Sequence, residues 1–158
     1  MSFLDIDEAI AAVAQKIDLV YGPLVDAQQF PEDVDLVLVE GAVSSQEDLA
    51  KIQLIRERSK YLVALGDCAV TSNVPAMRNA VPVRKLLDRV YVEGAVQDPG
   101  VPAEGVPKLL RRAVPVHEAV KVDLHVPGCP PAAGTILYVL GELLEGRTPD
   151  LSSKVRFG

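Results

Sequence analysis

The chain has 158 residues and a formal net charge of −6; hydrophobic residues make up 49% of it and aromatic residues only 4%. This length favours one domain with an aliphatic core. The acidic balance argues against a nucleic-acid partner, because a phosphate backbone would be repelled, and so few aromatic rings cannot build a base-stacking platform. No apolar run approaches the roughly 20 residues of a membrane span, and the acidic start lacks a signal-peptide pattern. We therefore expect a cytoplasmic protein with reduced cysteines.

The first part of the chain predicts a helix followed by alternating strands and helices. Apolar residues at helical spacing predict a helix over Asp5–Lys16, and a short strand is expected at Asp18–Tyr21. The β-branched and leucine-rich run Val34–Val39 predicts a strand buried on both faces, as in a parallel sheet. The pair Ser44–Ser45 supplies cap candidates for a helix over Gln46–Arg58, whose first turn is acidic.

The second part continues the alternation around a proline-rich stretch. Its expected elements, in chain order, are a buried strand at Tyr61–Leu65, irregular structure over Val81–Val116 with short helices near Val83–Arg89 and Val106–Arg112, an edge or half-exposed strand at Val122–Val126, and a helix at Pro131–Leu144. This order predicts a doubly wound α/β parallel sheet with helices on both faces. Such a sheet normally opens on a strand, so the first strand is expected to be missing here.

Polar and sulfur-bearing residues follow three of the predicted strands. In open α/β sheets, ligands gather outside the carboxyl ends of the strands, so the loops that leave these ends are expected to share one edge. The candidate site residues on them are Glu40, Gly41, Asp67, Cys68, Gly128 and Cys129.

The stretch VPGCPP frames Cys129 with residues of restricted or unusually free backbone geometry. Gly128 lets the backbone approach a bulky inorganic group, and the prolines fix the turn. This frame suits a thiolate ligand, and iron–sulfur clusters take four of them, whereas the chain has two cysteines. For Cys68 alone, a buried small hydrophobic side chain is an equally good interpretation.

Three stretches together resemble the small subunit of NAD-reducing (bidirectional) nickel–iron hydrogenases. They are VEGAV at Val39–Val43, GDCAVTSNVPAMRN at Gly66–Asn79, and DLHVPGCPP at Asp123–Pro131. The quinone-reductase subunit of respiratory complex I shares the GxC and PGCPP elements more loosely. The resemblance extends over essentially the whole chain.

The resemblance implies a single flavodoxin-like electron-transfer domain over residues 1–158 with one proximal 4Fe-4S cluster. It makes Cys68 and Cys129 the third and fourth cluster ligands. The first two, with the first strand, normally precede the position of Met1, so we expect a truncated sequence. Glu40, Gly41, Asp67 and Gly128 become candidates to hydrogen-bond near the cluster or relay protons, with Asp67 favoured as a residue that orders its turn.

The implied partners are a large subunit that holds the nickel–iron site and diaphorase subunits with flavin and iron–sulfur clusters. Two alternatives remain open within the fold: a quinone-site iron–sulfur subunit of a complex I-like enzyme, and a cluster-free flavodoxin-like binding module. A redox-active thiol protein is a further alternative, because Cys129 precedes a helix. His117 and His125 are expected to be surface, interface or core side chains rather than cluster ligands.

Overall fold

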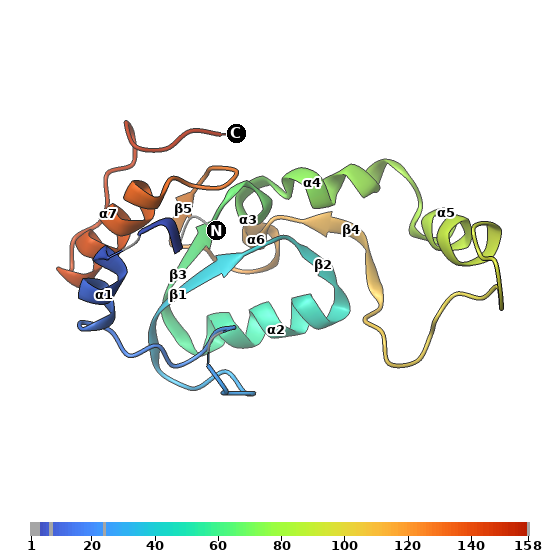
Figure 1. Cartoon of the computed structure of the whole chain (residues 1–158), viewed down its shortest axis with the longest axis horizontal. Helices are drawn as coiled ribbons and strands as arrows, with labels where there is room; N and C mark the ends of the chain where they lie inside the picture. Colours follow the sequence, from blue (N-terminus) through green and yellow to red (C-terminus); the bar gives the residue numbers. More distant parts are fainter. Residues whose placement is uncertain (1–3, 7, 24, 158) are drawn as a thin grey trace.

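The computed structural model describes residues 4–6, 8–23 and 25–157, and a parallel β-sheet lies at its centre (Figure 1). In the described residues its strands lie in the order β1 (Val34–Glu40), β3 (Ser59–Leu65) and β5 (Leu124–Val126). The register places Glu40 beside Leu65 and Leu65 beside Val126, so the strands end at the same edge. The three strands predicted in these regions are confirmed, and β5 lies at an edge of the sheet. The expectation that Val34–Val39 is buried on both faces is wrong: β1 lies at the other edge of the described sheet, its side chains are at most partly buried, and Asp35 and Glu40 are exposed.

Helices cover both faces of the sheet, as the alternation of elements predicts. In β3, Leu62 and Ala64 belong to one apolar cluster, and Val63 and Leu65 belong to the other. The first cluster includes residues of α2 (Gln46–Glu57), α3 (Asp67–Thr71) and α6 (Val116–Ala119), and the second includes residues of α1 (Ala9–Ala14) and α7 (Ala133–Leu144). Burial on both faces explains why β3 is apolar without interruption from Leu62 to Leu65. The predicted α/β fold class is confirmed.

The start of α2 follows its predicted cap. The Ser45 hydroxyl accepts a hydrogen bond from the Asp48 N–H at 3.0 Å, and the Asp48 carboxylate accepts one from the Ser45 N–H at 2.8 Å. This reciprocal pair is a capping box. Burial raises the pKa of Asp48, but hydrogen bonds from Ser44 and Ser45 outweigh it and hold that pKa below its usual value.

The segment Val106–Arg112, for which the sequence predicts a helix, instead leads into a strand. This strand, β4 (Leu109–Val114), pairs antiparallel with β2 (Val43–Ser45) in a separate ribbon. The Asn79 amide stabilises the strand conformation, because its Nδ2 donates to the Ala113 carbonyl and its Oδ1 accepts from the Ala113 N–H, both at 2.8 Å. The helix prediction is wrong because these bonds come from a segment 34 residues away, which local periodicity does not register.

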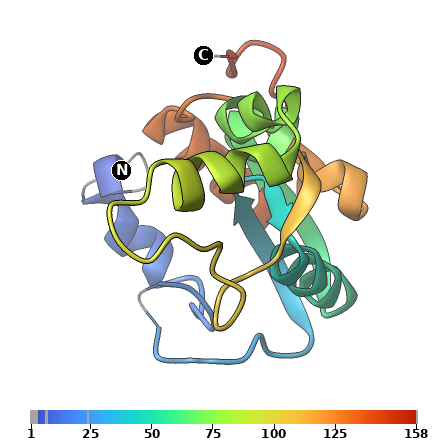
Figure 2. The same cartoon turned by 90° about the vertical axis from the view of Figure 1, so that its right-hand side faces the viewer.

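Short helical pieces connect the sheet to this ribbon. In chain order they are α4 (Asn73–Ala76), the 3₁₀ turn η2 (Met77–Ala80), α5 (Val83–Asp88) and the π-helical turn η3 (Arg89–Glu93). The helix predicted near Val83–Arg89 is therefore present. Helix α5 and the loop that follows it project away from the sheet (Figure 1), and α5 lies nearest the viewer in Figure 2.

The N-terminal prediction needs two corrections. The expected helix over Asp5–Lys16 is the shorter α1, preceded by the 3₁₀ turn η1 (Leu4–Ile6), and Asp7 lies outside the described residues. The strand predicted at Asp18–Tyr21 is absent. Leu19 and Val20 are exposed, and no described strand lies beside them to pair with their backbone groups.

Helices long and apolar enough to cross a membrane are not found in the described parts of the chain.

Candidate functional site

The candidate site residues lie on loops at the carboxyl edge of the sheet. Glu40 is the exposed last residue of β1, and Gly41 follows it with φ of 82°. Cys68 lies in α3, directly after β3, and is partly buried. Cys129 is exposed in the loop between β5 and α7. Because β1, β3 and β5 are neighbours, the topology gathers the three loops at one edge.

Hydrogen bonds join the loop before Cys68 to the loop before Cys129. The Gly66 N–H donates to the Val126 carbonyl at 2.7 Å, and the Asp67 N–H donates to the Gly128 carbonyl at 2.9 Å. In return the Gly128 N–H donates to the Asp67 carboxylate at 2.6 Å. Asp67 is only 3% exposed, so its carboxylate acts in a largely water-free contact. These bonds fix the two cysteine-bearing loops relative to each other.

Gly128 occupies a position that no other residue fits. Its φ is 142°, and a Cβ atom there would lie 2.5 Å from the Pro131 Cα and 2.7 Å from the Pro131 nitrogen. The turn at Cys129 therefore folds back tightly on itself, and Pro131 lies against the Gly128 backbone. Cys129 is presented at the outside of this turn by a rigid frame.

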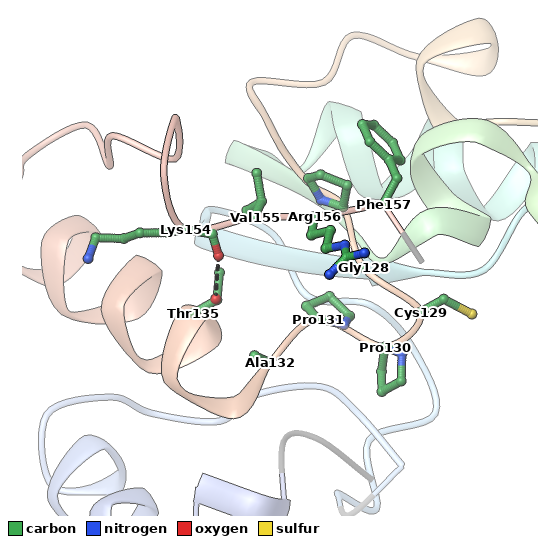
Figure 3. Close-up of a pocket in the computed structure, with 11 residues that line it drawn as sticks. Gly128, Cys129, Pro130, Pro131, Ala132, Thr135, Lys154, Val155, Arg156 and Phe157 are labelled. Carbon is green, nitrogen blue, oxygen red and sulfur yellow. Dashed lines mark hydrogen bonds between the residues drawn. The ribbon is translucent and has the colours of Figure 1, made fainter.

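A surface pocket of about 370 Å³ lies beside this turn (Figure 3). Its walls are residues 127–132 and Thr135 on one side and the C-terminal residues 154–157 on the other. The Thr135 hydroxyl donates to the Lys154 carbonyl at 2.8 Å and so ties the C-terminal segment to α7. Figure 3 shows the Cys129 sulfur directed outward, away from Thr135 and Lys154.

The donor set fits part of an iron–sulfur site. Two thiol side chains lie on neighbouring, hydrogen-bonded loops, and iron–sulfur clusters are held by such thiolates. The described residues contain no group of three or more His, Cys, Asp or Glu side chains that could hold a metal ion. The described residues therefore provide two thiol donors of the kind that a four-thiolate set requires, and not four.

Ser72, at the junction of α3 and α4, is a residue that the sequence does not single out. It has φ of 64° although it is not glycine, it is 1% exposed, and its hydroxyl has no hydrogen-bond partner in the described structure. Its N–H donates to the Cys68 carbonyl at 3.1 Å. A left-handed backbone at this point ends the turn that carries Cys68, and the strain of that conformation is stored beside the candidate site.

Ser72→Gly is expected to stabilise the chain by about 1 kcal/mol, because glycine adopts this φ without strain and removes a buried hydroxyl. Ser72→Ala is the matched control. It removes the hydroxyl but keeps the Cβ atom, so its free energy of unfolding should rise less than that of Ser72→Gly. Urea unfolding of the three proteins measures both effects. A Ser72→Gly variant less stable than the alanine variant would contradict the strain argument.

The comparisons with known proteins agree with this geometry. The family model of the NADH ubiquinone oxidoreductase 20 kDa subunit matches residues 1–143. The chain belongs to this family, a class of oxidoreductase subunits.

The relatives within the family include hydrogenase subunits. The chain is 38% identical to the NAD-reducing hydrogenase HoxS subunit delta of Cupriavidus necator, over 98% of this chain and 77% of the relative. It is 34% identical to a subunit of the F420-non-reducing hydrogenase of Methanocaldococcus jannaschii, over 98% of this chain but only 54% of that relative.

A solved structure gives the same result for the fold. A chain from the crystal structure of an NAD⁺-reducing nickel–iron hydrogenase in the H2-reduced state superposes with a TM-score of 0.94 at 37% identity. The superposition covers 100% of this chain and 90% of that one. The predicted resemblance to nickel–iron hydrogenase small subunits is confirmed.

Proposed function

We propose that this chain is the electron-transferring small subunit of an NAD-reducing nickel–iron hydrogenase. One observation carries the proposal: Cys68 and Cys129 lie on loops joined by the Asp67–Gly128 hydrogen bonds, in a chain closely related to a subunit of such an enzyme. The chain as a whole, residues 1–158, would act as one electron-transfer domain.

Cys68 and Cys129 would be two of the four ligands of a proximal 4Fe-4S cluster. A bound cluster would accept and release one electron at a time. Because the sequence has only these two cysteines, the other two ligands would come from outside it. Asp67 and Gly128 would keep the two ligands at a fixed separation, so that the site changes little in geometry between redox states.

Glu40 and Gly41 have a different proposed role. Glu40 is exposed at the end of β1, in register with Leu65 and thus one residue from the start of the Cys68 loop. An exposed carboxylate there is placed to hydrogen-bond a partner subunit or relay a proton at the interface. Gly41, with its positive φ, turns the chain away from the sheet and leaves that carboxylate accessible.

The large subunit with the nickel–iron site would cover the segment after Cys68. Several apolar side chains there are exposed, including Met77 at 74% and Val96 at 98%, and single-chain proteins rarely leave such groups together in water. The further exposed apolar residues of this segment are Val74, Val81, Val90, Tyr91 and Val92. Diaphorase subunits with flavin would accept the electrons, and the complex would be cytoplasmic.

A second candidate function is the quinone-site subunit of a complex I-like oxidoreductase, which the matching family model favours. The two candidates share the cluster and differ in the electron acceptor. Reduction of NAD⁺ by hydrogen in the purified complex supports the first, and reduction of a soluble quinone without NAD⁺ reduction supports the second.

Replacement of the cysteines tests the cluster. In the complex purified with its partner subunits, Cys129→Ser and Cys68→Ser should each remove the low-temperature EPR signal of the proximal cluster and lower the iron and sulfide content. Ala132→Ser is the matched control, because it changes an exposed residue of the same loop and should leave the signal intact. An unchanged cluster signal in Cys129→Ser would rule out the proposed site and favour the cluster-free module.

A further inference from the structure

The two histidines of the chain lie together on the surface. His117 is in α6 and His125 is in β5, and their ring centroids are 5.6 Å apart with the ring planes at 67°. Both side chains are exposed. The chain has no other histidine. Two imidazoles in contact at the edge of the sheet therefore form a cluster that the cysteine site does not use.

The separation of the rings suits a shared metal ion. A zinc-bound imidazole nitrogen lies about 2.1 Å from the metal, so each ring centre lies about 3.2 Å from it and two such rings are about 4.5–6.4 Å apart. The observed 5.6 Å falls within this range. Because both rings are exposed, each can turn about its Cβ–Cγ bond to direct a nitrogen at the ion.

The electrostatic surroundings keep His125 available as a ligand. Partial burial, and then the neighbouring His117, lower the pKa of His125 from its ordinary value, which favours the neutral imidazole. Neutral imidazole is the form that binds a metal ion. Glu118 follows His117 on α6 and is also exposed, but no third His, Cys, Asp or Glu of the described chain completes a metal-binding group.

We propose that His117 and His125 form a two-point binding site for a divalent ion of the imidazole-binding metals, Zn²⁺, Ni²⁺ or Cu²⁺. Water or a side chain of a neighbouring protein would fill the remaining positions, as in a site that is open on its solvent side. The bound ion would tie α6 to the edge strand β5.

The test uses the full chain purified without a histidine tag and titrated with Ni²⁺ alone by calorimetry. One ion per chain is expected at pH 7.5, and His117→Gln and His125→Gln should each weaken the affinity roughly tenfold or more. A lower pH should also weaken the affinity, because protons compete with the ion for imidazole nitrogen. Substitution with Cu²⁺ should give an EPR spectrum with nitrogen hyperfine splitting that both variants lose.

Two control variants separate this site from other ligands. Glu118→Gln changes the neighbouring carboxylate and should leave the Ni²⁺ affinity within about twofold of that of the unaltered chain. A Cys68→Ser/Cys129→Ser double variant should still bind the ion. Because both histidines are exposed, thermal melting should confirm that the glutamine variants stay folded. Absence of binding, unchanged affinity in either histidine variant, or loss of binding in the cysteine variant would overturn the proposal.

Discussion

Gly128→Ala is expected to destabilise the chain by about 3 kcal/mol and to abolish assembly of the proposed cluster. The added Cβ would lie 2.5 Å from the Pro131 Cα, a backbone atom that cannot move aside as the end of a flexible side chain can. Alanine is also strained at a φ of 142°. The turn must therefore open, which shifts Cys129 and weakens the bond between the Gly128 N–H and Asp67. Urea unfolding gives the stability change, and iron content gives the loss of the cluster.

Gly134→Ala is the matched control for this substitution. Gly134 lies in the first turn of α7, and a Cβ atom there would have no neighbour within 4 Å. Alanine favours a helix more than glycine, so the control should be neutral or stabilising by up to about 1 kcal/mol. The structural account of the Cys129 turn would be wrong if the two variants unfolded at the same denaturant concentration.

Asp67→Ala is expected to cost about 2 kcal/mol of unfolding free energy, because it leaves the buried Gly128 N–H without its charged acceptor. Asp67→Asn keeps an oxygen in the same place and should cost less. Loss of the hydrogen bond between the Gly128 N–H and the Asp67 carboxylate should also loosen the turn at Cys129. The rate at which an alkylating reagent modifies the Cys129 thiol should therefore rise more in the alanine variant than in the asparagine variant.

The stability and activity of Asp67→Ala and Asp67→Asn, compared with each other, distinguish a positioning role of Asp67 from a proton-relay role. A positioning role predicts that stability and electron transfer fall together and that Asp67→Asn largely preserves both. If the proposed function holds, a relay role predicts a stable Asp67→Asn complex with much slower hydrogen-dependent NAD⁺ reduction, because the amide cannot carry a proton. Unfolding and activity measured on the same preparations separate the two results.

The strands of the central sheet and the loops that follow them could be predicted because their signals are local. Tyr61–Leu65 is a continuous apolar run, Val34–Val39 is apolar except for Asp35, and Ser45 forms a cap with Asp48 within four residues. The strand-to-loop order then placed Cys68 and Cys129 at one edge. The role of Asp67 as a residue that orders its own turn stays a prediction; the partner of its carboxylate, the Gly128 N–H, lies in a loop 61 residues away, which no local pattern indicates.

The remaining features depend on contacts that no local pattern encodes. The strand β4 depends on the Asn79 amide and on pairing with β2, so the short run around Leu109 gave the wrong helix prediction. The Asp18–Tyr21 prediction failed for the opposite reason: a suitable local pattern is not a strand when no partner lies beside it. The left-handed backbone of Ser72 could not be predicted either, because a serine in the sequence does not indicate a positive φ.

The distance along the chain between the two cysteine loops has a consequence for how the protein is made. Asp67 and Cys68 are synthesised long before Gly128, yet the bonds that position them come from that later residue. Contacts between such distant residues form late, because a long loop must close before they are gained. While the protein is still on the ribosome, the Cys68 turn therefore has its local bonds but lacks those from Gly128. Insertion of the proposed cluster would have to follow the synthesis of β5, and until then the Cys68 thiol would be open to other reactions.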